Sequence, residues 1–114
     1  MSTASEISEG LGPIRDRFLV LLHKQQMEIL DELDVVLNTP DHSLDAFGRI
    51  ESKLHKTAGT AGTLGLVDLG NTARHAEEQI MAYRAGDPTR NADEACDAVI
   101  RFLGLSIEVS TQAA

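Results

Sequence analysis

Apolar residues recur every three or four positions in four stretches of this chain, and this pattern constrains the fold more than any other feature. Residues that break helices separate the stretches, at Asn38-Thr39-Pro40, at Gly65 and at Ala85-Gly86-Asp87-Pro88. No segment alternates with a period of two over a useful length, so we expect no strand. Four amphipathic helices joined by short turns bury their apolar faces best against one another. The pattern therefore predicts an all-α protein, an antiparallel up-and-down four-helix bundle.

The ends of the helices follow from residues with special backbone preferences. Proline suits the first turn of a helix, so the first helix is expected to begin at Pro13. Gly65 supplies a left-handed stop for the second helix, and Asn91 with Glu94 forms an N-cap pair for the fourth. The helices are predicted over residues 13–37, from between 39 and 43 to 64, 66–83 and from 91 onward. We expect a flexible tail over residues 1–12, one bundle domain over residues 13–109 and a second flexible tail over residues 110–114.

The charge balance, the hydropathy and the cysteine content of the chain exclude several classes of function. Ten basic and eighteen acidic side chains in 114 residues give a net charge of -8, so the chain should repel the phosphate backbone of nucleic acids. No apolar run approaches the ~20 residues of a membrane helix, and the N-terminal residues lack the pattern of a signal peptide. The single cysteine, Cys96, suits a reducing compartment and is expected to be a small buried or boundary residue. We expect a cytoplasmic monomer whose apolar stripes are used inside the bundle, without nucleic-acid or membrane partners.

The second predicted helix contains glycines where a helix usually avoids them. Gly59 and Gly62 lie well inside it, and each costs about 1 kcal/mol relative to alanine. At about 100° per residue, His55 lies roughly 140° from the centre of the apolar stripe. Gly59 and Gly62 share its outward direction, and Ser52 and Gly48 extend the same surface toward the start of the helix. We call the surface of these five residues the glycine face. It should present one exposed imidazole where another protein can approach closely.

This arrangement indicates phosphoryl transfer. A neutral imidazole is a good nucleophile at cytoplasmic pH, because an unperturbed histidine titrates near ~6.5. Phosphoryl transfer depends mostly on positioning and on cations near the moving charge. A lone imidazole offers neither a metal site nor a base of its own. A partner docked on the glycine face would therefore have to supply the metal and the carboxylate that exchanges the phosphoryl group.

The spacing His55-x-x-x-Gly59-x-x-Gly62-x-x-Gly65 resembles the signature of histidine-containing phosphotransfer (HPt) domains of bacterial two-component relays. The resemblance covers all four predicted helices, roughly residues 13 to 108. It implies that His55 accepts a phosphoryl group at Nε2 from a receiver-domain aspartate or from a histidine kinase, and passes it to another receiver. It also implies that the protein is a phosphocarrier rather than an enzyme. The chain would have no nucleotide, metal or cofactor site, and magnesium would belong to the receiver domain.

The third predicted helix supports the same resemblance, and one position departs from it. Glu77 or Glu78, followed by Arg84-Ala85-Gly86, is similar to the way this helix ends in the family. Many members have a lysine three residues after the histidine, where its ammonium helps to neutralise the phosphoryl group; here that residue is Ala58. Lys56 is a candidate replacement, although it lies about 100° around the helix from His55. Lys53 points still further away and is interpreted as a solvated charge.

Several alternatives remain open from the sequence. The chain is also compatible with a degenerate phosphotransfer domain that only docks receiver or kinase domains, or with the N-terminal phosphotransfer domain of a chemotaxis-type kinase. His55 could be an incidental surface residue, and the glycines could permit close packing of two helices. A metal site in the core would need inward Glu-x-x-His pairs; only Glu51 and His55 come near this pattern, at a spacing of four. The remaining histidines, His23, His42 and His75, are expected at the surface.

Overall fold

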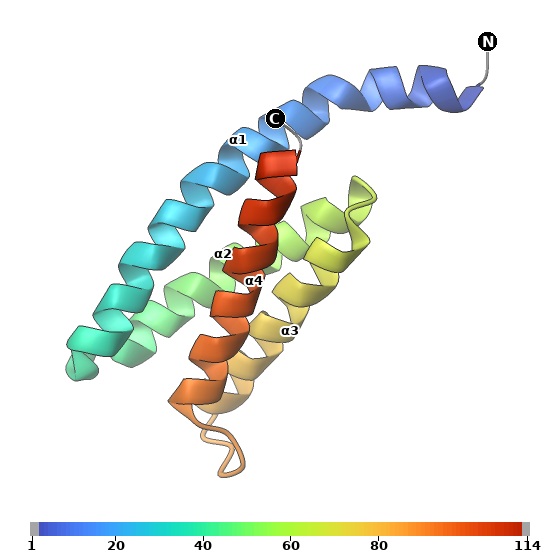
Figure 1. Ribbon diagram of the computed structural model, residues 1–114. Helices are drawn as coiled ribbons and strands as arrows, with labels where there is room; N and C mark the ends of the chain where they lie inside the picture. Colours follow the sequence, from blue (N-terminus) through green and yellow to red (C-terminus); the bar gives the residue numbers. More distant parts are fainter. Residues whose placement is uncertain (1–2, 113–114) are drawn as a thin grey trace.

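The computed structural model describes residues 3–112, with side chains from residue 12 onward. It contains four α-helices and one short 3-10 helix, namely α1 (Thr3–Asn38), η1 (Pro40–His42), α2 (Ser43–Thr63), α3 (Val67–Arg84) and α4 (Ala92–Gln112). The helices pack against one another around a shared core (Figure 1), and residues 3–112 contain no strand. The prediction of an all-α protein with four packed helices is therefore confirmed. Residues 1, 2, 113 and 114 of the two predicted tails lie outside the described part of the chain.

The start of α1 differs from the prediction. The helix begins at Thr3, and Pro13 lies inside it rather than in its first turn. An internal proline removes one backbone hydrogen bond and tends to bend the axis, but helical bonding can continue on both sides of it. In Figure 1 the N-terminal part of α1 extends past the other helices. At the other end of the chain, α4 continues to Gln112, beyond the predicted limit of residue 109.

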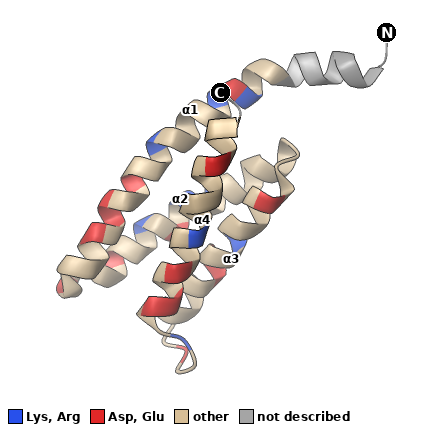
Figure 2. Cartoon of the chain, viewed as in Figure 1, with Lys and Arg blue, Asp and Glu red and all other residues tan. Residues whose placement is uncertain are grey.

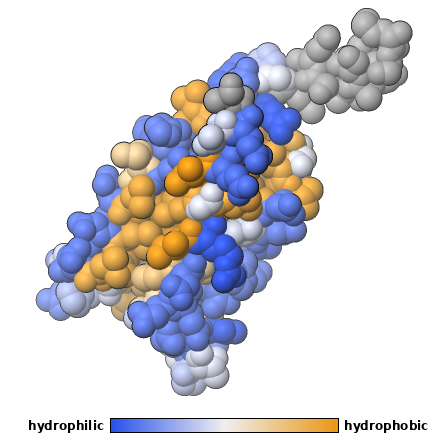
Figure 3. Space-filling view, in the orientation of Figure 1, coloured by the Kyte–Doolittle hydropathy of each residue, from blue (hydrophilic) through white to orange (hydrophobic). Residues whose placement is uncertain are grey.

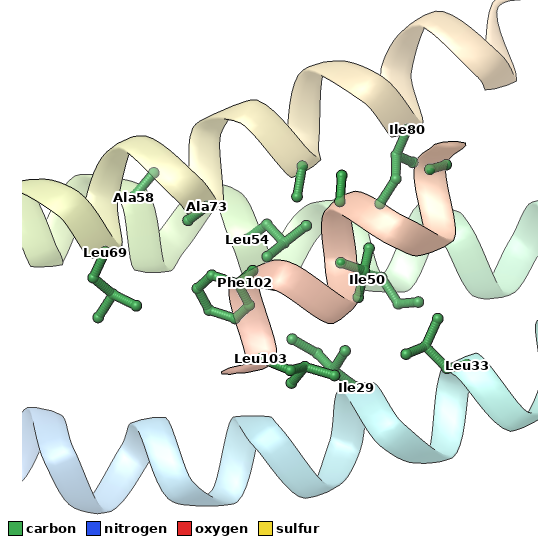
Figure 4. Packing of buried hydrophobic residues seen from close by; sticks show 14 of the residues in the cluster. Ile29, Leu33, Ile50, Leu54, Ala58, Leu69, Ala73, Ile80, Phe102 and Leu103 are labelled. Carbon is green, nitrogen blue, oxygen red and sulfur yellow. The ribbon is translucent and has the colours of Figure 1, made fainter. Parts of the chain in front are cut away.

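The core is formed by apolar side chains from all four long helices. Figure 4 shows how they converge, and the fully buried ones of largest volume include Leu22, Ile29, Phe47, Ile50, Leu54, Leu69, Ile80, Val99 and Phe102. Phe47 meets the ring of Tyr83 edge-on, with the centroids 5.5 Å apart and the ring planes at 70°, an arrangement that aromatic pairs favour. Buried polar side chains are paired as well, since Gln26 donates to Ser106 Oγ at 2.7 Å. The aromatic pair thus joins α2 to α3, the hydrogen bond joins α1 to α4, and the shared apolar core holds the two pairs together.

Backbone geometry confirms the predicted ends of α2 and α3 and the predicted start of α4. Gly65 and Gly86 have φ angles of +78° and +83°, in the left-handed region that favours glycine. Gly65 follows α2, where the Leu66 amide donates to the Ala61 carbonyl at 2.8 Å. At the start of α4, the Glu94 amide donates to Asn91 Oδ1 at 2.8 Å, as expected for an N-cap. The turns that position the ends of α2, α3 and α4 are therefore encoded locally.

The surface is acidic but not uniformly polar. Figure 2 shows acidic residues distributed over α1, α3 and α4, whereas Figure 3 shows an apolar surface that runs over α1 and α4. Large exposed apolar side chains on these two helices are Ile14, Val20, Leu21, Met27, Leu30, Leu37, Ile100 and Ile107. The prediction that the apolar stripes are used inside the bundle is right for the inward residues of α4, which are buried, but wrong for part of α1, where Leu30 and Leu37 are 47% and 69% exposed. None of the helices within residues 3–112 is long and apolar enough to cross a membrane.

Candidate functional site

His55 lies on the outer side of α2, and its side chain is 78% exposed. Its neighbour Leu54 is completely buried, so the helix turns the imidazole outward while it anchors the preceding residue in the core. The outward direction that the helical spacing predicts for His55 is therefore confirmed. The backbone of α2, rather than a pocket, determines where the ring stands.

One edge of the His55 ring is held by α3. Its Nδ1 atom lies 3.1 Å from Oε1 and 3.2 Å from Oε2 of Glu77, whose own side chain is only 15% exposed. A carboxylate accepts hydrogen bonds, so this contact favours the tautomer in which Nδ1 carries the proton. Within the described residues no group hydrogen-bonds Nε2. Glu77 thus leaves the outer nitrogen with its lone pair available and aimed away from α3.

The sequence did not distinguish Glu77 from its neighbour Glu78. The structure places Glu78 at the exposed surface, without a hydrogen bond to His55 among the described residues, and Glu77 against the ring. The difference arises from the helix geometry of α3, because consecutive residues point about 100° apart. Glu77 follows Ala76 and Ala73, whose burial marks the inner face of α3. A helical wheel of α3 places Glu77 at the edge of the buried face, but it does not show that this edge meets α2.

The middle and end of the glycine face are open. A β-carbon at Gly59 or at Gly62 would meet no described atom within 4 Å outside the backbone of its own helix turn. Both residues are exposed, as is Ser52 one turn before His55. The alternative that Gly59 and Gly62 lack side chains to make room for another helix is therefore wrong for their β-carbon positions. A partner surface can approach the backbone of α2 here without displacing any side chain.

The beginning of the glycine face is covered. A β-carbon at Gly48 would lie 3.0 Å from the guanidinium carbon of Arg84, the last residue of α3. Arg84 also donates to Glu51 Oε2 at 3.0 Å, so two contacts hold it across the gap between α2 and α3. Gly48 therefore makes room for Arg84 rather than for a partner. Arg84, named in the sequence only for its place at the helix end, borders the site.

Ala58, at the position where the HPt domains that the motif resembles often have a lysine, is buried at 5% exposure. Here α2 packs closely against α3, because a β-carbon at Gly70 would lie 3.3 Å from the Ala58 carbonyl oxygen and 3.4 Å from the Gly62 amide nitrogen. Gly70 is buried and permits this approach. This contact is made by the Ala58 backbone, and the small side chain of Ala58 is buried beside it. Gly70 belongs to no motif in the sequence, although it directly follows Leu69, which is also buried in α3.

The lysines lie on the other side of α2, toward α1. Lys56 lines a groove between α1 and α2 together with Thr60, while Lys53 forms an ion pair with Glu28 of α1 at 3.2 Å. Both side chains thus leave α2 on the side opposite Glu77. The interpretation of Lys53 as a solvated charge is only partly right, since this residue links two helices. Lys56 is exposed and adjacent to His55 in sequence, but no described contact joins it to the ring.

The remaining candidate residues do not gather into a second site. His23, His42 and His75 are exposed, as predicted. Among the described side chains no three histidine, cysteine, aspartate or glutamate residues are placed to share a metal ion. Cys96 is buried in α4, and burial raises the pKa of its thiol, with Asp93 and Asp97 adding to the effect. A buried neutral thiol is unsuited to act as a nucleophile.

The site therefore consists of an exposed imidazole, a carboxylate that holds one of its nitrogens and an open glycine surface beside it. His55 lines neither of the two grooves described for residues 12–112. What it offers chemically is a nucleophilic nitrogen presented to a second macromolecule. Comparisons of the chain with protein-family models, with curated proteins and with solved structures find no match, so the motif and this geometry are the basis for assigning a function.

Proposed function

We propose that this chain is a histidine phosphotransfer protein in which His55 carries the phosphoryl group. The donor is an aspartyl phosphate of a receiver domain or a phosphorylated histidine kinase, including a hybrid kinase, and the acceptor is the aspartate of another receiver. The observation that carries the proposal is the pairing of His55 Nδ1 with Glu77 at 3.1 Å on a ring that is 78% exposed. The antiparallel up-and-down bundle of the family and a cytoplasmic location belong to the same proposal.

The contact with Glu77 gives a physical reason for transfer at Nε2. The Nε2 lone pair forms a bond to phosphorus while the bond from phosphorus to the aspartyl oxygen breaks and leaves a free carboxylate on the receiver. Nδ1 keeps its proton, so the phosphorylated ring carries a positive charge. The carboxylate of Glu77 faces that charge and stabilises it, because ion pairs favour the charged form of each partner. The reverse sequence of bond changes returns the phosphoryl group to a receiver.

The open glycine face accounts for access of the donor. Backbone-level approach at Gly59 and Gly62 lets a receiver bring its aspartate and its magnesium ion to the imidazole without a side chain in the way. Positioning of this kind contributes most of the catalysis in phosphoryl transfer. Since residue 58 is alanine and Lys56 lines the groove toward α1 instead of contacting the ring, the cation that neutralises the phosphoryl group would come from the receiver. The chain then acts as a carrier, and the partner completes the active site.

The proposal is tested by transfer of radiolabelled phosphoryl groups from several phosphorylated receiver domains to the wild type and to His55→Gln. We expect acid-labile, alkali-stable label on the wild type and none on the variant. Circular dichroism and thermal melting of His55→Gln should match the wild type, because the ring is outside the core. His75→Gln, which removes an exposed histidine of α3, is the matched control and should label normally. A label on His55→Gln would overturn the assignment of the carrier residue.

The role of the glycine face is tested separately with Gly59→Leu. The substitution should leave the helix intact, since leucine has the higher helix propensity, but it should block transfer by covering the approach to His55. Transfer at the wild-type rate would show that the receiver does not dock over Gly59. If no donor labels the wild type while receivers still bind to it, the chain is instead a degenerate module that only docks them, an outcome consistent with the buried Ala58.

A further inference from the structure

A groove between α1 and α2 has a charge opposite to that of the molecule. It encloses about 480 Å³ and is lined by Arg17 and by every lysine of the chain, Lys24, Lys53 and Lys56. Among the described residues that line it, Glu28 is the only acidic one, and it already forms an ion pair with Lys53. A chain with a net charge of -8 thus places four of its ten basic side chains along one groove. The groove favours a negatively charged occupant.

The same groove is apolar along α1. Phe18 lies buried at its base, while Ile14 and Leu21 are 50% and 63% exposed beside it. These residues follow one another at spacings of four and three along α1, which is the spacing at which a helix presents anchors to a partner helix. The groove thus combines exposed apolar side chains with exposed cations. An amphipathic partner with acidic residues beside its apolar face would match both.

The base of the groove is fixed by hydrogen bonds. Thr57 Oγ1 donates to Gln25 Oε1 at 2.6 Å, and the Gln25 amide donates to the Lys53 carbonyl at 3.0 Å. These bonds join α1 to α2 beneath the apolar residues, so the groove exists before any partner binds. A preformed groove lowers the conformational cost of binding.

The shape of the groove indicates a helix as its occupant. The lining residues of α1 run from Ile14 to Glu28, which corresponds to about 20 Å along the helix axis. Both walls are helices whose backbone groups are bonded internally, so they offer no edge to pair with an extended peptide. A helix satisfies its own backbone and needs only side-chain contacts. An open groove of this length also encloses too little of a small molecule to bind it well.

We infer that this groove binds an acidic amphipathic helix of a partner protein. Its apolar residues pack on Ile14, Phe18 and Leu21, and its carboxylates meet Arg17, Lys24 and Lys56. The groove adjoins the glycine face, because Lys56 directly follows His55, while the imidazole itself turns toward α3. Binding in the groove does not require His55 to be phosphorylated, so this inference stands or falls independently of phosphoryl transfer.

Direct binding to a synthetic probe tests the inference. The probe is a helical peptide with leucine along one face and glutamate on both sides of it, and its counterpart has glutamine in place of every glutamate. We expect the glutamate peptide to bind the full chain and to shift the amide resonances of residues 14–28 and 53–60. The glutamine peptide should bind at least about tenfold more weakly. Added salt should weaken the binding of the glutamate peptide and leave the binding of the glutamine peptide unchanged.

Neighbouring residues of α1 provide a matched pair of variants. Leu21→Asp places a charge in the groove, whereas Val20→Asp places the same charge on the adjacent residue, which is 71% exposed and does not line the groove. We expect about tenfold weaker binding of the glutamate peptide for Leu21→Asp and for Lys56→Glu, and no change for Val20→Asp, Arg101→Glu or His55→Gln. Because all of these side chains are exposed, the variants should fold.

Three outcomes would overturn the inference. The glutamine peptide could bind as tightly as the glutamate peptide, which would remove the role of the cations. Val20→Asp could weaken binding as much as Leu21→Asp, which would place the peptide elsewhere on α1. Binding of anionic lipid vesicles without binding of either peptide would make the groove a lipid-binding surface. Retained binding of the peptide by His55→Gln alongside a failed transfer assay would contradict the phosphotransfer proposal alone.

Discussion

At the scale of single residues, the two nitrogens of His55 are in different environments. Nδ1 faces the carboxylate of Glu77, and Nε2 faces outward. An isolated surface histidine would sample several rotamers and both neutral tautomers. Contact with a side chain anchored on another helix restricts both the rotamer and the tautomer of His55. Part of the entropy cost of orienting the ring is therefore incurred when the protein folds and not when a partner binds. Glu77 is therefore a positioning residue for the proposed reaction.

Removal of the contact between Glu77 and His55 should alter the tautomer of the His55 ring while the fold stays intact. In Glu77→Ala we expect nitrogen NMR of the His55 imidazole to show a mixture of tautomers, whereas in the wild type the Nδ1–H form dominates. Transfer to His55 should slow by about tenfold or more, in the range of effects of residues that orient a reacting group. Glu77→Gln, which still offers an oxygen to Nδ1, should retain the tautomer but lose the charge that stabilises the phosphorylated ring.

Glu78→Ala is the control for both measurements, because Glu78 is the exposed neighbour of Glu77 on the same turn. It should leave the imidazole spectrum and the transfer rate unchanged. If Glu77→Ala keeps the wild-type tautomer, the carboxylate does not hold the ring in solution.

At the scale of the helices, the close approach of α2 and α3 determines what surrounds His55. Gly70 lets the backbone of α3 lie against Ala58 and Gly62. This contact brings Glu77 within reach of the imidazole two turns further along α3. It also buries the residue at which the family often has a lysine. The pairing of His55 with Glu77 and the burial of Ala58 thus both accompany the close approach of α2 and α3.

Gly70 and Gly104 offer a matched comparison of a packed and an open glycine. Gly70→Leu should lower the free energy of unfolding by about 1–3 kcal/mol, the usual effect of overpacking. Gly104→Leu should be neutral or raise the free energy of unfolding by up to about 1 kcal/mol, because no described atom lies near its β-carbon position and leucine favours the helix. Urea denaturation followed by circular dichroism measures both. Equal effects of the two substitutions would contradict the close packing at Gly70.

The helices themselves could be predicted from the sequence, whereas their contacts could not. Apolar spacing and the stops at Gly65 and Gly86 act locally, so they are visible in one dimension. The start of α1 was misplaced because an internal proline weakens a helix without necessarily ending it. The selection of Glu77, the cover of Gly48 by Arg84 and the burial of Ala58 depend on how α3 is placed against α2. That placement involves residues far apart in the sequence.

At the scale of the whole molecule, the charges are distributed unevenly around a conventional apolar core. Acidic residues dominate the surface as a whole, yet the lysines gather in the groove between α1 and α2. Composition gave the net charge but not this separation. The spacing of basic residues within one helix does not predict it, because the charges come from two helices whose relative rotation is a property of the folded protein.

Cooperative unfolding of the whole molecule exposes Cys96, and for this reason the free energy of unfolding should change with pH in the alkaline range. Burial raises the pKa of the Cys96 thiol, so the folded state keeps its proton at pH values where the unfolded state loses it. The stability from this residue is complete below about pH 8.5, the ordinary pKa of a cysteine, and is lost as the pH rises through the higher folded value.

Urea unfolding of the wild type and Cys96→Ala between neutral and alkaline pH isolates this effect. The difference in free energy of unfolding between the two proteins should be constant near neutral pH and should shift against the wild type above about pH 8.5. A difference that stays constant throughout would show that the Cys96 thiol titrates alike in both states.

The uncovered backbone of α2 at Gly59 also has a kinetic consequence. Without a side chain above it, the peptide group of this residue is shielded from water less than those of an ordinary helix interior. Its amide proton should therefore exchange with deuterium through local openings that leave the rest of the bundle closed. A macromolecule seated over His55 would slow this exchange, so deuterium uptake at Gly59 reports contact on that surface without any label or substitution.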